Sequence, residues 1–145
     1  MRIARAQRSI DLPIRRNFEP AVSASDLLAV LVVDDQKAVR DGLVSLIAAS
    51  GMPWRAVYAA ASRDEAMVIV RRHAPEVIVL DIDLAGDDGL ALLSQLDRHE
   101  RVLVLTTHDD AMSRQRALWL GATGFARKGE PSNALLLHLA AVAAR

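Results

Sequence analysis

The chain of 145 residues contains no cysteine, which excludes disulfides, thiolate metal sites and cysteine nucleophiles. Aromatic residues make up only 3%, so a core must be built from Leu, Val, Ile and Ala. No apolar stretch approaches the length that crosses a bilayer. Eighteen basic and eighteen acidic residues balance, which argues against a globally basic nucleic-acid-binding protein. These limits leave one domain, long enough to bury a genuine core.

The first 25 residues differ from the rest of the chain. They hold several arginines, two prolines and no lasting apolar periodicity, which predicts a flexible basic arm. Other interpretations are an arm that touches phosphate or an acidic partner, an Arg-rich transit peptide, or translation from an upstream start codon. A signal peptide is excluded because no apolar segment follows the arginines.

From residue 26 onward, short apolar runs alternate with helical patterns, which is typical of βαβ units around a parallel sheet. Continuous Val/Ile/Leu runs indicate strands buried on both faces. The expected strands are 27–33, 55–60, 77–80, 101–105 and 124–127. The expected helices are 38–49, 63–74, 90–96, 110–120 and 132–145, and Ser62 with Glu65 predicts a capping box before the second. The sequence therefore predicts an α/β fold of five βα units.

Polar side chains follow four of the expected strands. Asp34 and Asp35 follow the first, Asp81 the third, Thr106 the fourth and Lys128 the fifth. In open parallel sheets the carboxyl ends of the strands gather ligand chemistry, so we expect one site. Carboxylates so close repel one another, and Mg²⁺ with its oxygen ligands relieves that repulsion. A lysine and a hydroxyl can then neutralise and bind phosphoryl oxygens.

These stretches resemble the receiver domains of bacterial two-component response regulators, similar to those of LuxR-type helix-turn-helix regulators. The matching segments are Leu31-Val32-Val33-Asp34-Asp35, Val77-Ile78-Val79-Leu80-Asp81, Leu103-Val104-Leu105-Thr106 and Gly124-Phe125-Ala126-Arg127-Lys128. The resemblance covers residues 27–144 and implies a flavodoxin-like, doubly wound parallel sheet with strand order 2-1-3-4-5. It implies a cytoplasmic signalling phosphoacceptor rather than an enzyme.

The resemblance also assigns roles. Asp81 is expected to accept phosphate from a sensor histidine kinase or a histidine phosphotransfer protein. Asp34, Asp35, Asp81 and the backbone carbonyl of Asp83 are expected to hold Mg²⁺, and Thr106 and Lys128 to engage the phosphoryl group. Phe125 matches the switch aromatic of the family and is expected to turn inward when Thr106 moves, although an ordinary core aromatic would look the same.

The chain departs from the family pattern in three places. Leu84-Ala85 stands where many receivers have Met-Pro, and Asp88-Gly89 fits the family loop. Gly129 replaces a common proline after Lys128, which leaves the family's cis peptide open, since a non-proline cis bond costs about 3–4 kcal/mol. Asp83, with Thr107 and His108, lies where the family tunes dephosphorylation.

One rival explains Asp81-Ile82-Asp83 differently. An Asp-x-Asp pair after an apolar strand also begins the haloacid-dehalogenase-type phosphatases, with the first Asp as nucleophile. Their motif normally follows the first strand, whereas here it follows the third, and few residues remain for the rest of such an enzyme. The receiver interpretation is therefore preferred.

Within the last expected helix, the stretch from Ala134 to Ala144 is apolar on nearly every side, which is more than packing on one sheet face requires. Together with Trp119, this predicts a homodimer or partner surface over helix four, strand five and helix five. A receiver at 26–145 without an output domain is expected to bind no nucleic acid directly and no membrane. The alternatives are a phosphorelay intermediate or phosphate sink, or a truncated receiver of a DNA-binding transcription factor.

Overall fold

The computed structural model describes residues 26–84, 88–96, 100–107 and 111–145. The predicted basic arm at 1–25 lies outside this part of the chain. None of the helices described has the length and apolar character that a bilayer crossing requires.

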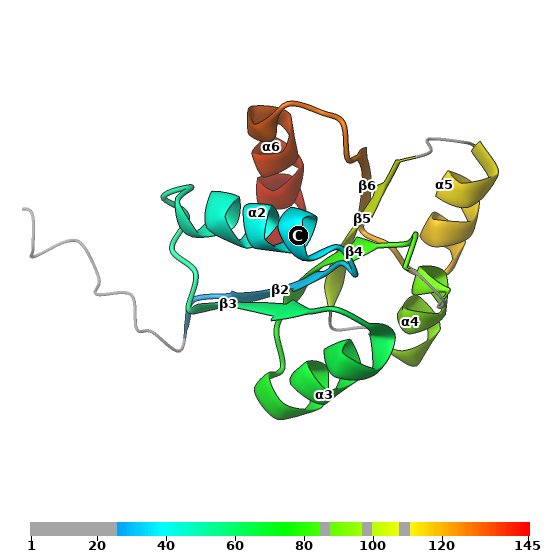
Figure 1. Cartoon of the computed structure of the whole chain (residues 1–145), viewed down its shortest axis with the longest axis horizontal. Coiled ribbons are helices and arrows are strands. Elements are labelled where there is room, and N and C mark those ends of the chain that lie inside the picture. Colours follow the sequence, from blue (N-terminus) through cyan, green and yellow to red (C-terminus); the bar gives the residue numbers. More distant parts are fainter. Residues whose placement is uncertain (1–25, 85–87, 97–99, 108–110) are drawn as a thin grey trace, which may run out of the picture.

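The centre of the molecule is a sheet of five parallel strands (Figure 1). The strands are β2 (Ala29–Val33), β3 (Ala56–Ala60), β4 (Val77–Asp81), β5 (Arg101–Thr106) and β6 (Gly124–Arg127). Their spatial order is β3-β2-β4-β5-β6, so the predicted flavodoxin-like order 2-1-3-4-5 is confirmed. All five residues of β2 and all five of β4 are buried, because helices cover both faces of the sheet.

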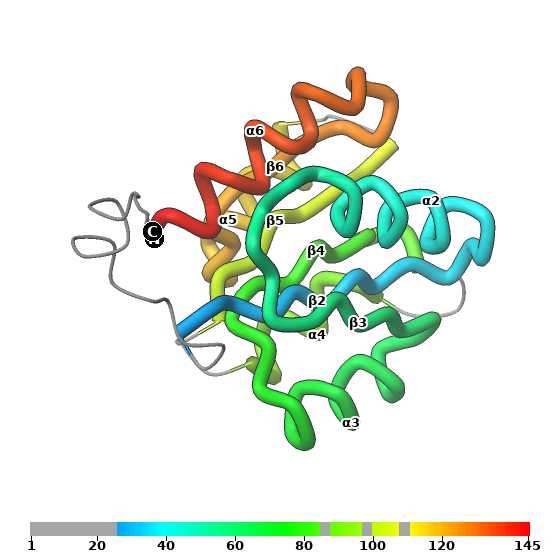
Figure 2. Tube along the Cα trace, turned by 90° about the vertical axis from the view of Figure 1, so that its left-hand side faces the viewer, coloured from blue at the N-terminus to red at the C-terminus, as the bar shows by residue number. Residues whose placement is uncertain are grey.

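In the part of the chain that the structure describes, helices cover both faces of the sheet (Figures 1 and 2). They are α2 (Lys37–Ala48), α3 (Arg63–His73), α4 (Gly89–Gln95), α5 (Ala111–Trp119) and α6 (Ser132–Ala143). Val30 and Val32 pack with Ile47 of α2 and Leu139 of α6. The alternate residues of β2 face a second cluster with α3, α4 and α5. The period-two alternation of β2 thus feeds two separate cores.

The local signals for helix ends hold in most places. Ser62 accepts a hydrogen bond from the Glu65 N–H at 3.2 Å, and the Glu65 carboxylate reaches back to the Ala61 N–H at 2.7 Å. Gly121 ends α5 with φ of +107°, a conformation that favours glycine. The ends differ from the prediction by up to two residues, as at β2, and Asp110, the predicted start of α5, lies outside the described residues.

Gly89 shows why the loop after β4 carries Asp-Gly. Asp88 caps α4 by accepting the Leu90 N–H at 3.0 Å. A Cβ at Gly89 would lie 2.5 Å from the Ile82 Cα and 2.7 Å from the Asp81 carbonyl oxygen. Only a residue without a side chain allows α4 to begin so close to the end of β4. The position thereby fixes the backbone that carries Asp81.

Candidate functional site

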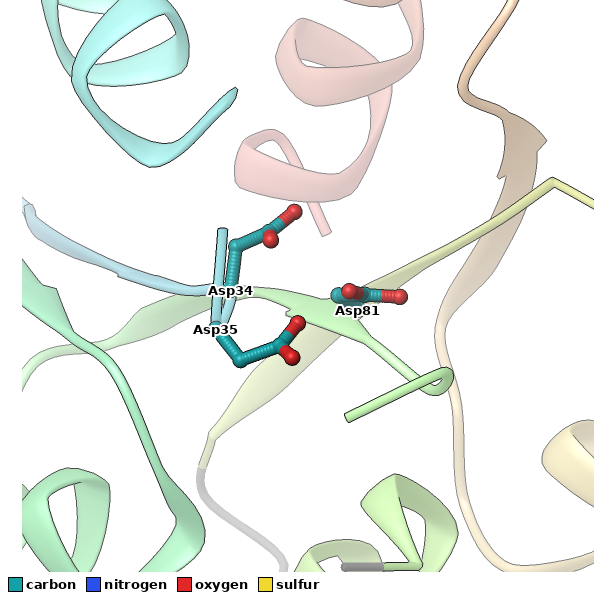
Figure 3. A group of neighbouring side chains, drawn as sticks. All are labelled: Asp34, Asp35 and Asp81. Carbon is teal, nitrogen blue, oxygen red and sulfur yellow. The ribbon is translucent and has the colours of Figure 1, made fainter. Parts of the chain in front are cut away.

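Three carboxylates gather where β2 and β4 end (Figure 3). Asp34 is 0% exposed, Asp81 is 2% exposed, and Asp35 is half-buried beside them. Each offers an oxygen, and these oxygens all lie within 4.8 Å of one another. Because a hard divalent cation prefers oxygen ligands, the donor set fits Mg²⁺. The acidic group expected from the sequence is therefore assembled at one edge of the sheet.

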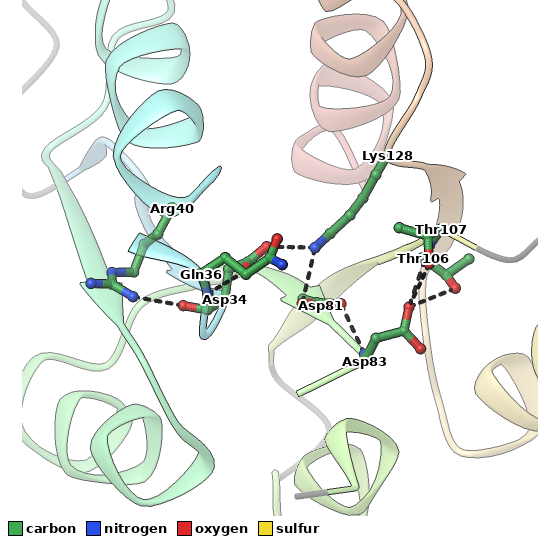
Figure 4. Close-up of polar contacts among 8 residues, drawn as sticks. All are labelled: Asp34, Gln36, Arg40, Asp81, Asp83, Thr106, Thr107 and Lys128. Atoms are coloured by element: carbon green, nitrogen blue, oxygen red, sulfur yellow. Dashed lines mark hydrogen bonds and ion pairs between the residues drawn. The ribbon is translucent and has the colours of Figure 1, made fainter. Parts of the chain in front are cut away.

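Lys128 lies between two of these carboxylates (Figure 4). Its Nζ is 2.8 Å from Asp34 Oδ2 and 3.0 Å from Asp81 Oδ2, and only 14% of its side chain is exposed. Burial alone would lower the pKa of Lys128, but the hydrogen bonds and charges of Asp34 and Asp81 outweigh it, so the pKa is raised. The lysine is therefore a fixed positive charge inside the site.

Backbone groups and the side chain of Arg40 hold Asp34 in place. The Gln36 N–H donates to Asp34 Oδ1 at 2.9 Å, and the Arg40 guanidinium donates to the Asp34 carbonyl at 2.9 Å. The Asp34 N–H itself donates to the Ala60 carbonyl at the end of β3. Neither Gln36 nor Arg40 was predicted as a site residue, since each reaches Asp34 across a turn that no strand or helix pattern describes.

Asp81 is held on both oxygens. The Asp83 N–H donates to its Oδ1 at 2.8 Å, while Lys128 contacts its Oδ2. Burial raises the pKa of Asp81 against these two contacts, which lower it, and the charge of Asp34 raises it further. The Asp81 side chain is thus oriented by its neighbours, while its burial disfavours the charged form.

Thr106 is the last residue of β5, at the same edge of the sheet as Asp81, and its hydroxyl contacts a neighbouring carboxylate. It is 1% exposed, and its Oγ1 donates to Asp83 Oδ2 at 3.2 Å. The same Asp83 oxygen accepts the Thr107 N–H and the Thr107 hydroxyl, each at 3.3 Å (Figure 4). The sequence identified Asp83 through its carbonyl and its charge, whereas the structure adds a side chain that binds both threonines.

Phe125 lies three residues before Lys128 and is buried at 8% exposure. The Arg114 guanidinium of α5 lies over its ring, 4.7 Å from the centroid, in cation–π geometry. No peptide bond in the described chain is cis, so the Lys128–Gly129 bond is trans. His108, expected near the site, lies outside the described residues.

Comparison with known proteins assigns the chain to a family. The model of the response regulator receiver domain matches residues 30–140. The chain belongs to the response regulator receiver family. It is 37% identical over 118 residues to a protein of Pseudomonas aeruginosa described as a putative transcriptional regulator, covering 79% of this chain and 56% of that protein. The chain thus spans only part of the length of such curated relatives, about a third in other cases.

Solved structures agree with this family. A LuxR-family two-component response regulator from Aurantimonas has a TM-score of 0.74 at 28% identity, covering 82% of this chain and 87% of that one. The N-terminal receiver domain of Klebsiella pneumoniae RstA, described as BeF3-activated, has a TM-score of 0.68 at 27% identity, covering 77% and 97%. The chain is therefore a receiver domain of the kind found in two-component signalling.

Proposed function

We propose that this receiver accepts a phosphoryl group on Asp81 from a sensor histidine kinase or a histidine phosphotransfer protein in the cytoplasm. The observation that carries the proposal is the buried pair of Asp81 and Lys128, 3.0 Å apart, beside the carboxylates of Asp34 and Asp35. Asp34, Asp35, Asp81 and the carbonyl of Asp83 would hold Mg²⁺. When bound, that cation neutralises phosphoryl and carboxylate oxygens and so lowers the barrier to attack.

In this mechanism an Asp81 carboxylate oxygen forms a bond to phosphorus. The bond between phosphorus and the imidazole nitrogen of the donor breaks, and its electron pair stays on that nitrogen. Lys128 faces the charge that develops on the phosphoryl oxygens, and its raised pKa keeps it protonated for this task. The Asp83 N–H on Oδ1 holds the carboxylate in a fixed orientation. Thr106 would donate its hydroxyl to a phosphoryl oxygen.

We further propose that the domain at 26–145 passes this event to a surface formed by α5, β6 and α6, called here the output face. Two observations support it. Trp119 at the end of α5 is 85% exposed and Leu137 on α6 is 70% exposed, so each of these two helices presents a large apolar side chain that a partner could cover. Phe125 of β6 packs under Arg114 of α5, so a movement of Thr106 at the neighbouring strand β5 would reach this face.

Other fates of the phosphoryl group remain open. A phosphorelay intermediate or phosphate sink would return the group rapidly to a histidine phosphotransfer protein and need no output face. A receiver cut from a DNA-binding transcription factor is the third possibility, and the Pseudomonas relative described as a putative transcriptional regulator supports it. A long-lived phosphoryl state with state-dependent partner binding would favour the switch over the sink.

The deciding experiment is intact mass after incubation with acetyl phosphate, with and without Mg²⁺. We expect one added phosphoryl group that requires Mg²⁺ and is absent in Asp81→Asn. Asp64→Asn is the matched control because it removes an exposed aspartate at the start of α3. Equal labelling of Asp81→Asn would place the acceptor elsewhere. No labelling of the wild type, under conditions that label a control receiver, would make the domain a constitutive binding module.

The output face has its own test. Multi-angle light scattering compares the mass of the chain with and without beryllofluoride and Mg²⁺. A dimer that appears only with beryllofluoride, and that Trp119→Ala and Leu137→Ala both weaken, is the result expected of a homodimer. A chain that stays monomeric at high concentration in both states rules the homodimer out and leaves a partner protein.

A further inference from the structure

The Asp83 side chain accepts hydrogen bonds from Thr106 and Thr107, which we expect to donate to a phosphoryl group on Asp81. Asp83 Oδ2 accepts from Thr106 Oγ1 at 3.2 Å, from the Thr107 N–H at 3.3 Å and from Thr107 Oγ1 at 3.3 Å (Figure 4). A threonine hydroxyl carries one proton and donates one full hydrogen bond. The Thr106 proton can therefore serve the Asp83 carboxylate or a phosphoryl oxygen, but not both at full strength.

The position of Asp83 makes this competition local. Its N–H donates to Asp81 Oδ1 at 2.8 Å, so its backbone is tied to the acceptor residue itself. Its side chain is exposed, unlike those of Asp81 and Thr106, and can rotate into solvent without moving that backbone. The carboxylate can thus leave the two threonines while the contact to Asp81 is kept.

Charge gives the exchange its direction. In the free protein the Asp83 carboxylate is an acceptor for hydrogen bonds from Thr106 and Thr107. A phosphoryl group on Asp81 brings about two negative charges next to that carboxylate. Like charges a few ångströms apart repel, and the exposed one escapes more readily into water than the covalently held one. The donors then pass to the phosphoryl oxygens.

We propose that Asp83 is a positioning residue that holds the Thr106–Thr107 corner at rest by competing with the phosphoryl group for its donors. This inference rests on the proposed function, because it needs a phosphoryl group on Asp81. It deepens that function by naming what opposes the switch. Displacing the Asp83 carboxylate from the two threonines opposes phosphoryl binding, so removal of that carboxylate should favour the phosphorylated arrangement.

The first test needs no phosphoryl group. The amide signal of Thr107 is followed by two-dimensional NMR, together with its rate of hydrogen exchange, in the wild type, Asp83→Asn and Asp83→Ala. We expect Asp83→Ala to shift the signal and speed exchange, and Asp83→Asn, which keeps an acceptor oxygen, to lie between. An unchanged Thr107 amide in Asp83→Ala would overturn the resting contact and the inference with it.

The second test measures the affinity for beryllofluoride in the presence of Mg²⁺ by tryptophan fluorescence. Asp83→Ala keeps the backbone carbonyl that is proposed to bind Mg²⁺. We expect it to bind beryllofluoride about tenfold more tightly, which corresponds to about 1.4 kcal/mol. Asp64→Asn removes the same charge without the threonine contacts and should stay within about twofold of the wild type.

A double-mutant cycle separates the donors from the charge. In a Thr106→Ala background the tightening caused by Asp83→Ala should fall to about threefold or less, because one contested donor is gone. Tightening of equal size in both backgrounds would mean that Asp83 acts through charge alone, and the inference would be wrong. A wild type that binds while Asp83→Ala binds no better overturns the inference only. A wild type that does not bind at all overturns the proposed function as well.

Discussion

Replacing Gly89 with alanine should destabilise this receiver, although alanine favours helices. A Cβ at position 89 would lie 2.5 Å from the Ile82 Cα, 2.7 Å from the Asp81 carbonyl oxygen and 2.9 Å from the Ile82 carbonyl carbon. All three atoms are backbone, so no side chain can rotate away. Either the first turn of α4 or the end of β4 must move. Forced overpacking of this kind costs about 1–3 kcal/mol of unfolding free energy.

Gly42→Ala is the matched control. Gly42 lies inside α2, and a Cβ built there meets nothing within 4 Å. The same substitution in the same kind of element should therefore stabilise the fold by about 0.5–1 kcal/mol. Both variants change the unfolded chain alike, so their difference reports the contact at Gly89. We expect a gap of about 1.5–4 kcal/mol between them.

Urea unfolding followed by circular dichroism and tryptophan fluorescence measures both variants under the same conditions. The two midpoints should move in opposite directions with little change in slope. The phosphorylation rate with acetyl phosphate should also fall in Gly89→Ala, because the displaced atoms belong to Asp81 and the next residue. Equal stability of the two variants would refute the reasoning, since it would mean that α4 shifts at no cost.

Two further substitutions test the charges of the fold. Lys128→Gln leaves the buried carboxylates of Asp34 and Asp81 without the ammonium group that they share, so the free energy of unfolding should fall by about 3 kcal/mol. Mg²⁺ should restore part of that loss and should therefore raise the melting temperature of the variant more than that of the wild type. An equal or smaller thermal shift in the variant would contradict the prediction. Burial alone would raise the pKa of Glu76, but hydrogen bonds, foremost from the Ala29 N–H at 2.8 Å, outweigh it and lower the pKa. A carboxylate whose pKa is lowered by folding stabilises the folded state at pH values above its pKa in the unfolded chain. This stabilisation is lost as the pH falls through the pKa of the folded state. Glu76→Gln should therefore lower the free energy of unfolding by about 1 kcal/mol near neutral pH and should approach the wild type at acidic pH. Urea unfolding at both pH values measures this, and an equal difference between the two proteins at both would show that the carboxylate charge is irrelevant.

The sheet could be predicted from the sequence because its strands carry their own signal. Strands buried on both faces need apolar side chains at every position, so runs such as the one in β4 are continuous. Once five such strands alternate with helices, parallel pairing brings their carboxyl ends to one edge. Asp34, Asp81 and Lys128 could therefore be grouped before any contact was known.

The contacts that set the resting state could not be predicted in this way. Thr106 was expected to engage the phosphoryl group, and no sequence pattern indicated that its hydroxyl contacts Asp83 in the free protein. That choice depends on side-chain rotamers across two strands, which no periodicity encodes. The cation–π contact of Arg114 with Phe125 could not be predicted for the same reason, because it depends on how the side chains of α5 and β6 meet. Sequence patterns place backbones, whereas competing polar contacts decide which donor meets which acceptor.

The charge balance of the site explains why that competition matters. Asp34, Asp35 and Asp81 with Lys128 carry two net negative charges when all are ionised, which one divalent cation balances. An acyl phosphate on Asp81 replaces one negative charge with about two. Neutral hydrogen-bond donors would have to stabilise this additional negative charge. Thr106 and Thr107 are donors at that edge of the sheet, and both already donate to the Asp83 carboxylate. A phosphoryl group on Asp81 would therefore compete with the Asp83 carboxylate for the same hydrogen bonds, and displacement of the Asp83 side chain is the expected result.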